Sequence, residues 1–302
     1  MLYRLTACLI VMLVVLAGCD RSAVKAAALI EQDDVVRATT APIGSLAQRI
    51  AGDVVPVEML CPNEQSPASW RPDPETIGRY QRASLVVING ADFETWVRFA
   101  SLPRSRVVWT ARAIEDELIV VQGKAHSHGP SGEHAHEETL GYTWLDPIHA
   151  IAQAGSIANA LKSTYPESAA QFDHNFMLLH QELREQHERL NALGRSHVQI
   201  AVPERPLGYL ARRYRWPSVR IGDDATAWPE ILNDSRQSQD TPVLLLSPHR
   251  LSQSEITTLR TAYEIRVVLW ETGELQIHRP YLETLAANID RLQTAIEEVS
   301  MP

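Results

Sequence analysis

The fold is decided by a long helical run in the middle of the chain, PESAAQFDHNFMLLHQELREQHERLNAL, from Pro166 to Leu193. Apolar residues recur in it at steps of three, four or seven: Ala169, Phe172, Phe176, Leu179, Leu183, Leu190 and Leu193. This spacing places one apolar stripe along one face of a helix. About 28 residues at 1.5 Å each give a helix of roughly 40 Å, which can span a small domain. We predict that this helix connects two lobes.

The segments on both sides of this run alternate between strand and helix patterns. Before it, Leu85-Val86-Val87-Ile88 is a continuous apolar stretch of the kind that is buried on both faces of a parallel sheet. After it, Val198–Val202, Val243–Leu246 and Val267–Leu269 are strand patterns separated by helical ones. Such alternation predicts right-handed βαβ units. We therefore predict an α/β fold with two lobes built on parallel sheets and bridged by one long helix.

The predicted boundaries divide the chain around the bridge. Residues 34–146 form an N-terminal lobe with a His-rich loop at 124–139, residues 147–195 form linking helices, and residues 196–302 form a C-terminal lobe. Two such lobes leave a cleft between them. Because open α/β sheets bind ligands beyond the carboxyl ends of their strands, the cleft is the predicted ligand site.

The N-terminus has the pattern of a signal peptide. Arg4 is a minimal positive region, Leu5–Leu16 is apolar, and Leu16-Ala17-Gly18-Cys19 follows. The apolar segment is short for a membrane span and has the length of a signal-peptide core. An uncleaved anchor helix is the alternative interpretation.

The Leu-Ala-Gly-Cys ending resembles the bacterial lipobox, which implies cleavage before Cys19 and lipidation of its thiol. Residues 1–18 are then the lipoprotein signal peptide, and residues 19–33 are a tether. Asp20 resembles the signal that retains such lipoproteins at the inner membrane of Gram-negative bacteria. The predicted location is therefore extracytoplasmic, on the periplasmic face of the inner membrane, with a lipid anchor.

Charge and cysteine content exclude several classes of site and partner. Without residues 1–18 the chain has 27 basic and 37 acidic residues, and this acidic balance argues against nucleic acid as a partner. Once Cys8 has left with the signal and Cys19 carries lipid, only Cys61 remains. An intramolecular disulfide and a cysteine metal cluster are then both excluded.

A His-rich loop precedes the linking helices. Four of the chain's eleven histidines lie within eleven residues, at His126, His128, His134 and His136. Neutral imidazoles in His-x-His pairs can chelate borderline metals such as zinc, copper or nickel. Because ordering the loop costs conformational entropy, we expect a modest affinity. A solvent-exposed loop with incidental histidines is the alternative.

A set of short phrases covers nearly all of residues 34–298 in a characteristic order: Ala38-Thr39-Thr40-Ala41-Pro42, Pro72-Asp73-Pro74, Leu85 to Trp96, Trp144-Leu145-Asp146-Pro147, Gly208 to Tyr214, and Tyr281 to Asn288. With the lipobox and the His-rich loop, this set resembles the zinc- and manganese-binding solute receptors of ABC importers. The resemblance implies two α/β lobes bridged by one long helix. It also implies a metal held in the cleft by three histidines and a carboxylate, and its delivery to a membrane permease.

The residues at the positions of the family's ligands depart from that pattern. The resemblance places its three histidines at Ala68, Tyr142 and Glu204, and its carboxylate at Trp270, or at Glu271 if the register shifts by one. Alanine offers no donor and a neutral tyrosine is a poor one, so Glu204 and Glu271 are the candidate cleft ligands. Trp70, Tyr142 and Trp270 would make this cleft apolar. The alternative for Glu204 is a solvated or salt-bridged carboxylate.

The leading interpretation is a lipid-anchored solute receptor of a metal ABC importer, with zinc or another divalent metal as its cargo and a His-rich loop that captures it. The alternative is a receptor fold repurposed without a cleft metal site, which binds an organic ligand or a protein partner. The chain has no Gly-x-Ser-x-Gly, P-loop or His-Glu-x-x-His motif, so we predict that it is not an enzyme.

Overall fold

The structure is a computed structural model, and it describes residues 32–122, 126–127, 133–134, 137–194, 196–216, 218–222, 226–239, 241–275 and 279–300. The chain divides into two units, Met1–Asp33 and Asp34–Pro302. The predicted signal peptide and Cys19 lie outside the described residues. Both predicted lobes belong to the second unit, and the boundaries between lobes and linking helices stay predictions.

The N-terminal lobe is built on a four-stranded sheet in the order β2-β1-β3-β4. Its strands are β1 (Asp33–Ala38), β2 (Val57–Met59), β3 (Ala83–Ile88) and β4 (Val107–Trp109). β1 pairs with β2, and β3 with β4, in parallel. All residues of β3 are buried, as the continuous apolar stretch predicts for an inner strand of a parallel sheet. Helices α2 (Ala41–Ala51) and α3 (Pro74–Arg82) belong to this lobe.

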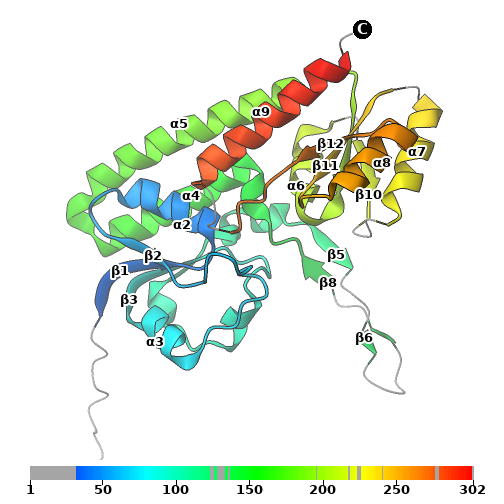
Figure 1. Cartoon of the computed structure of the whole chain (residues 1–302). Helices are drawn as coiled ribbons and strands as arrows, with labels where there is room; N and C mark the ends of the chain where they lie inside the picture. The colour runs from blue at the N-terminus through cyan, green and yellow to red at the C-terminus, as the bar shows by residue number, and fades with distance from the viewer. Residues whose placement is uncertain are drawn as a thin grey trace, which may run out of the picture. The chain divides into compact units, whose positions relative to one another are not determined.

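The C-terminal lobe repeats this organisation with a second four-stranded sheet, in the order β10-β9-β11-β12. Its strands are β9 (Gln199–Pro203), β10 (Ser218–Ile221), β11 (Val243–Ser247) and β12 (Arg266–Leu269), and all neighbouring pairs are parallel. Helices α6 (Glu204–Tyr214), α7 (Trp228–Gln239) and α8 (Gln253–Tyr263) connect them. The predicted α/β fold with two parallel sheets is confirmed (Figure 1).

The predicted long helix is α5 (Ala169–Leu193), preceded by α4 (Pro147–Thr164). It begins three residues later than predicted, because Pro166–Ser168 forms a short 3-10 turn. Its stripe faces inward: Phe172, Leu179, Leu183 and Leu190 are fully buried. The C-terminal helix α9 (Tyr281–Ser300) runs beside α5, so the bridge contains α9 as well as the single long helix that we predicted (Figure 1).

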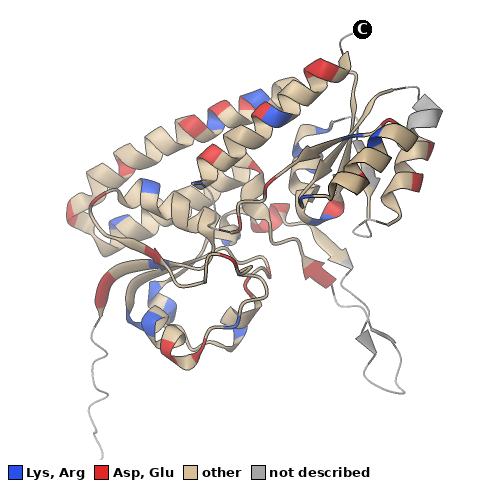
Figure 2. Ribbon diagram, in the orientation of Figure 1, with Lys and Arg blue, Asp and Glu red and all other residues tan. Residues whose placement is uncertain are grey.

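One contiguous hydrophobic core passes through the bridge and both sheets, and includes Val36 of β1, Leu179 of α5 and Leu244 of β11. On the outside, α5 and α9 carry both acidic and basic residues (Figure 2). Among the described residues, no helix has the length and apolar character that a membrane span requires.

Candidate functional site

A cavity of about 730 Å³ lies beyond the carboxyl ends of β9, β11 and β12. The N-terminal lobe contributes Tyr142 to its wall, and the C-terminal lobe contributes the segments that follow the three strands. Ligands of open α/β sheets bind at this edge. We take this cavity as the candidate site and refer to it as the cleft cavity.

Two of the residues that the sequence singled out lie in the wall of the cleft cavity, Tyr142 and Glu271. Ala68 is partly buried and packs against the main core, as Tyr142 also does. Glu204, the first residue of α6, is exposed and lines a separate cavity of about 200 Å³. The structure therefore brings Glu271, but not Glu204, to the cleft cavity.

Trp270 differs from the expectation that it faces the cleft. It is fully buried in the main core, between Leu269 and Glu271, which both line the cleft cavity. Successive side chains of an extended segment point to opposite sides, so a residue between two wall residues faces inward. Trp70 is also buried, in a second core cluster with Tyr80 and Trp96. The expected apolar lining by Trp70 and Trp270 is corrected: of the three rings, Tyr142 lines the cavity.

Glu271 is held in place by helix α9. Its carboxylate Oε2 accepts a hydrogen bond from Arg291 at 2.9 Å, and Oε1 lies 3.8 Å from Arg250. The Asn288 side chain also bonds to both the backbone N–H and the backbone carbonyl of Glu271, at 2.9 and 2.8 Å. Because two guanidinium groups compete for this carboxylate, it is a weak candidate for a metal ligand.

Glu274 is the carboxylate that the sequence interpretation missed. It follows Gly273, whose φ of +72° is a conformation that glycine adopts without steric cost. Its Oε2 is buried and has no hydrogen-bond partner among the described residues. Burial raises the pKa of Glu274, whereas the hydroxyl of Tyr142, the charge of His249 and the hydroxyl of Ser66 act in the opposite direction. The sequence feature that could have identified Glu274 is its position as the second acidic residue of Glu271-Thr272-Gly273-Glu274, shortly after the last strand.

His249 also lines the cleft cavity, from the segment after β11. It is exposed, and it lies close enough to Glu274 for its charge to favour the ionised carboxylate. The alignment of family phrases does not place a ligand at this position. The structure therefore brings together Ser66, Tyr142, His249 and Glu274, which come from four distant parts of the sequence.

These residues offer a sparse donor set for a metal ion. The described residues contain no group of three or more His, Cys, Asp or Glu side chains with the spacing of a metal site. Burial and the nearby Glu274 raise the pKa of Tyr142, so its phenol stays neutral and acts as a hydrogen-bond donor. Glu274 and His249 are thus the two good donors, whereas zinc in a closed site normally has four.

Two paired strands flank the His-rich loop in the sequence. β5 (Val120–Gln122) pairs in antiparallel fashion with β8 (Glu137–Thr139). Farther out, β6 (His126–Ser127) pairs with β7 (Glu133–His134), and the register makes His126 and His134 partners. His128 and His136 lie outside the described residues.

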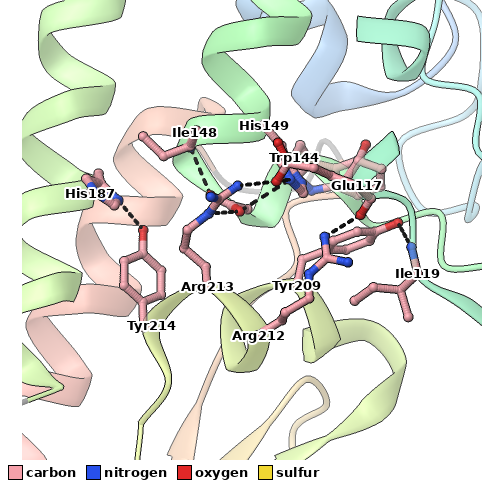
Figure 3. A network of polar contacts seen from close by, with 12 residues as sticks. Glu117, Ile119, Trp144, Ile148, His149, His187, Tyr209, Arg212, Arg213 and Tyr214 are labelled. Carbon is pink, nitrogen blue, oxygen red and sulfur yellow. Dashed lines mark hydrogen bonds and ion pairs between the residues drawn. The ribbon is translucent and has the colours of Figure 1, made fainter. Parts of the chain in front are cut away.

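A network of polar contacts connects α6 with Glu117, Leu140 and Asp146 of the N-terminal lobe (Figure 3). Arg213 donates to the buried Asp146 at 2.6 Å and to Glu117 at 2.9 Å. His149 is fully buried, and its Nε2 lies 3.1 Å from Glu117. Burial lowers the pKa of His149, so the ring is neutral at neutral pH. Tyr209 of α6 donates to the Leu140 carbonyl at 2.7 Å.

Comparisons with known proteins agree with this architecture. In sequence, the chain is 28% identical over 139 residues to the zinc-binding lipoprotein AdcA of Streptococcus pneumoniae, covering 44% of this chain and 27% of AdcA. It thus spans about a quarter of the length of that relative. It is 26% identical over 227 residues to the high-affinity zinc uptake system protein ZnuA of Bacillus subtilis, covering 73% of this chain and 70% of ZnuA.

In structure, the chain resembles the metal-dependent lipoprotein YcdH of Bacillus subtilis, with a TM-score of 0.72 and 19% identity. The likeness covers 87% of this chain and 98% of YcdH. The model of the family "ZnuA: Zinc-uptake complex component A periplasmic" matches residues 36–295. This description names a component of an uptake complex and not an enzyme, as the sequence predicts. Because the match spans nearly the whole described chain, the protein belongs to the ZnuA family of zinc-uptake components.

Proposed function

We propose that the protein is the extracytoplasmic receptor of a metal ABC importer, anchored by lipid on Cys19, and that it delivers zinc or another divalent metal to a membrane permease. The observation that carries this proposal is the family match over residues 36–295, which contain the cleft cavity. The lipobox and the zinc-binding relatives support it.

The chemistry of the cleft cavity supports metal as the cargo. Zinc accepts histidine nitrogen and carboxylate oxygen as ligands, and His249 and Glu274 supply one of each. The buried and unpaired Oε2 of Glu274 favours a positive partner, since an ionised carboxylate that is removed from water is costly without one. We propose His249 and Glu274, in place of Glu204 and Glu271, as the residues that bind metal in the cleft.

We propose that the His-rich loop collects metal for this site. Its base is tied to the cavity wall, because Glu138 of β8 pairs with Arg205, at 3.2 Å, and Arg205 lines the cleft cavity. β8 ends only three residues before Tyr142. The partnership of His126 and His134 in the hairpin register supports joint metal capture by the loop.

Isothermal titration with zinc tests the proposal, with residues 20–302, which contain the whole of the larger compact unit. We expect a tighter event in the cleft and a weaker one in the loop. Changing His126, His128, His134 and His136 to Ala should remove the weaker event. The double variant His249→Ala/Glu274→Gln should remove the tighter one.

A matched control is His174→Ala/His180→Ala, which removes two imidazoles from α5 that do not line the cleft cavity. This variant should bind zinc as the unaltered protein does. If none of these forms binds zinc in the titration, the protein is not a metal receptor.

The second candidate function is a receptor fold that binds an organic ligand or a protein partner. The size of the cleft cavity, about 730 Å³, favours it, because a bare ion fills only a small part of such a volume. Thermal unfolding of metal-free protein with pools of small molecules separates the two functions, since a ligand of the folded state raises the midpoint by mass action.

A further inference from the structure

The cleft cavity is far larger than a metal ion requires. Its volume is about 730 Å³, whereas a water molecule occupies about 30 Å³ in the liquid. Sites for small organic molecules span roughly 300–1,000 Å³. Its dimensions therefore suit an ion that arrives together with an organic molecule.

The wall of the cavity carries three arginines, each from a different segment. Arg205 follows β9, Arg250 follows β11, and Arg279 precedes α9. The side chain of Arg250 is 77% exposed, and its ion pair with Glu271, at 3.8 Å, is long. Glu271 already has a closer cation in Arg291, at 2.9 Å. Arg205 is paired with Glu138, so Arg250 and Arg279 are the wall residues whose guanidinium groups can bind an anionic ligand through paired hydrogen bonds.

The same cavity wall also carries two side chains that can act as zinc ligands, Glu274 and His249. Among the described residues, Oε2 of Glu274 has no hydrogen-bond partner. Zinc prefers four ligands, and two of them would be missing. Carboxylate oxygens of a chelator can supply the missing ligands, and its remaining carboxylates can bind the arginines.

We propose that the cleft takes zinc as an anionic chelate, in which a small polycarboxylate shares the ion with Glu274 and His249 and binds Arg250 and Arg279. This inference rests on the proposed function as a metal receptor. It changes the cargo from a bare cation to a metal–carboxylate complex. No covalent bond forms or breaks in this binding.

Equilibrium dialysis tests it, with residues 20–302 in which the four loop histidines are changed to Ala, so that the loop does not contribute. The probes are zinc alone, radiolabelled citrate alone, and zinc with citrate. We expect citrate and zinc to be retained in equal amounts when both are present. We expect at least tenfold weaker retention of either probe alone.

Arg250→Gln/Arg279→Gln should lower retention of zinc–citrate at least tenfold, whereas zinc alone should be retained at least as well as by the unaltered protein, because two positive charges are removed from the cavity wall. The matched control is Arg260→Gln, an exposed arginine on α8 outside the cavity wall, which should have no effect.

The outcomes separate this inference from the function on which it rests. Zinc retained equally well without citrate, and unaffected by the arginine variant, would overturn the chelate and leave the metal receptor standing. Citrate retained equally well without zinc would overturn the chelate and favour a receptor for organic anions. Retention of neither zinc nor zinc–citrate would overturn both the chelate and the metal receptor.

Discussion

At the scale of single residues, Glu271 and Glu274 are close in sequence but have different surroundings. Glu271 is neutralised by Arg291 and held by Asn288, so its charge serves to attach α9. Glu274 has a buried oxygen with no hydrogen-bond partner and no cation within ion-pair distance among the described residues. The hydroxyl groups of Tyr142 and Ser66 stabilise the carboxylate in part, but removing an ionised carboxylate from water still costs free energy without a positively charged partner. Burial of the ionised Glu274 carboxylate therefore lowers the stability of the folded protein.

Replacing Glu274 should change the stability of the protein by an amount that depends on pH. Burial raises the pKa of Glu274 above its usual 4.5, so the folded state binds the proton more tightly than the unfolded state does. Ionisation then lowers stability at neutral pH, and the loss disappears as the pH falls below 4.5. In metal-free buffer, Glu274→Gln should raise the thermal midpoint at pH 8, and the gain should shrink towards pH 4.5.

Glu255 provides the control of opposite sign. In the capping box of α8, hydrogen bonds from the side chain and the backbone N–H of Ser252 lower the pKa of the Glu255 carboxylate. The folded state therefore favours the ionised form, and Glu255→Gln should lower the midpoint at pH 8 and have less effect at acid pH. A gain from Glu274→Gln that stays the same across this pH range would contradict the assignment.

At the scale of elements, α6 is attached to the N-terminal lobe by polar contacts rather than by apolar packing alone. Arg213 lies between Glu117 and Asp146, and the side chain of Asp146 is only 1% exposed. Asp146 also caps α4, by accepting the backbone N–H of Ile148 at 2.9 Å. The first turn of α4 and the last turn of α6 are thus held by the same carboxylate.

Removing Arg213 should therefore destabilise the protein strongly. Arg213→Met leaves a buried carboxylate without its cation, a change that costs about 3 kcal/mol. Urea unfolding measures it. The control is Arg49→Met, which breaks an ion pair with Glu182 between side chains 44% and 42% exposed and should cost at most about 1 kcal/mol. Equal losses in the two variants would show that the Asp146 pair contributes no more than a surface pair.

At the scale of the whole molecule, the proposed lipid anchor and the candidate site belong to different units of the chain. Cys19 belongs to the unit Met1–Asp33, whereas the cleft cavity is lined by residues of Asp34–Pro302. Cys19→Ala should move the protein from the membrane fraction to the soluble fraction, because the lipid attachment point is lost. Immunoblots of fractionated cells measure this change.

Cys8→Ala and Cys61→Ala are the matched controls. Cys8 lies in the predicted signal peptide away from the lipobox, and Cys61 is a buried cysteine of the N-terminal lobe. Both variants should stay in the membrane fraction. Recovery of Cys19→Ala with the membranes would show that another segment anchors the chain.

The sequence by itself determined the fold class and the long helix. Apolar periodicity is a local property of the chain, so Phe172, Leu179 and Leu183 predict the buried face of α5 without knowledge of its neighbours. The same holds for β3, whose continuous apolar residues predict an inner strand. The sequence did not predict that α9 is part of the bridge, because the apolar face of α9 does not specify which element it packs against.

The candidate site was decided only by the tertiary structure. A shift of one residue along an extended segment reverses the direction of its side chains, so Trp270 faces the core whereas Leu269 and Glu271 face the cavity. Ser66, Tyr142, His249 and Glu274 meet because distant segments fold against one another, and no short-range pattern encodes such proximity. Local periodicity therefore determined which elements form, whereas packing between those elements determined which side chains share the cleft.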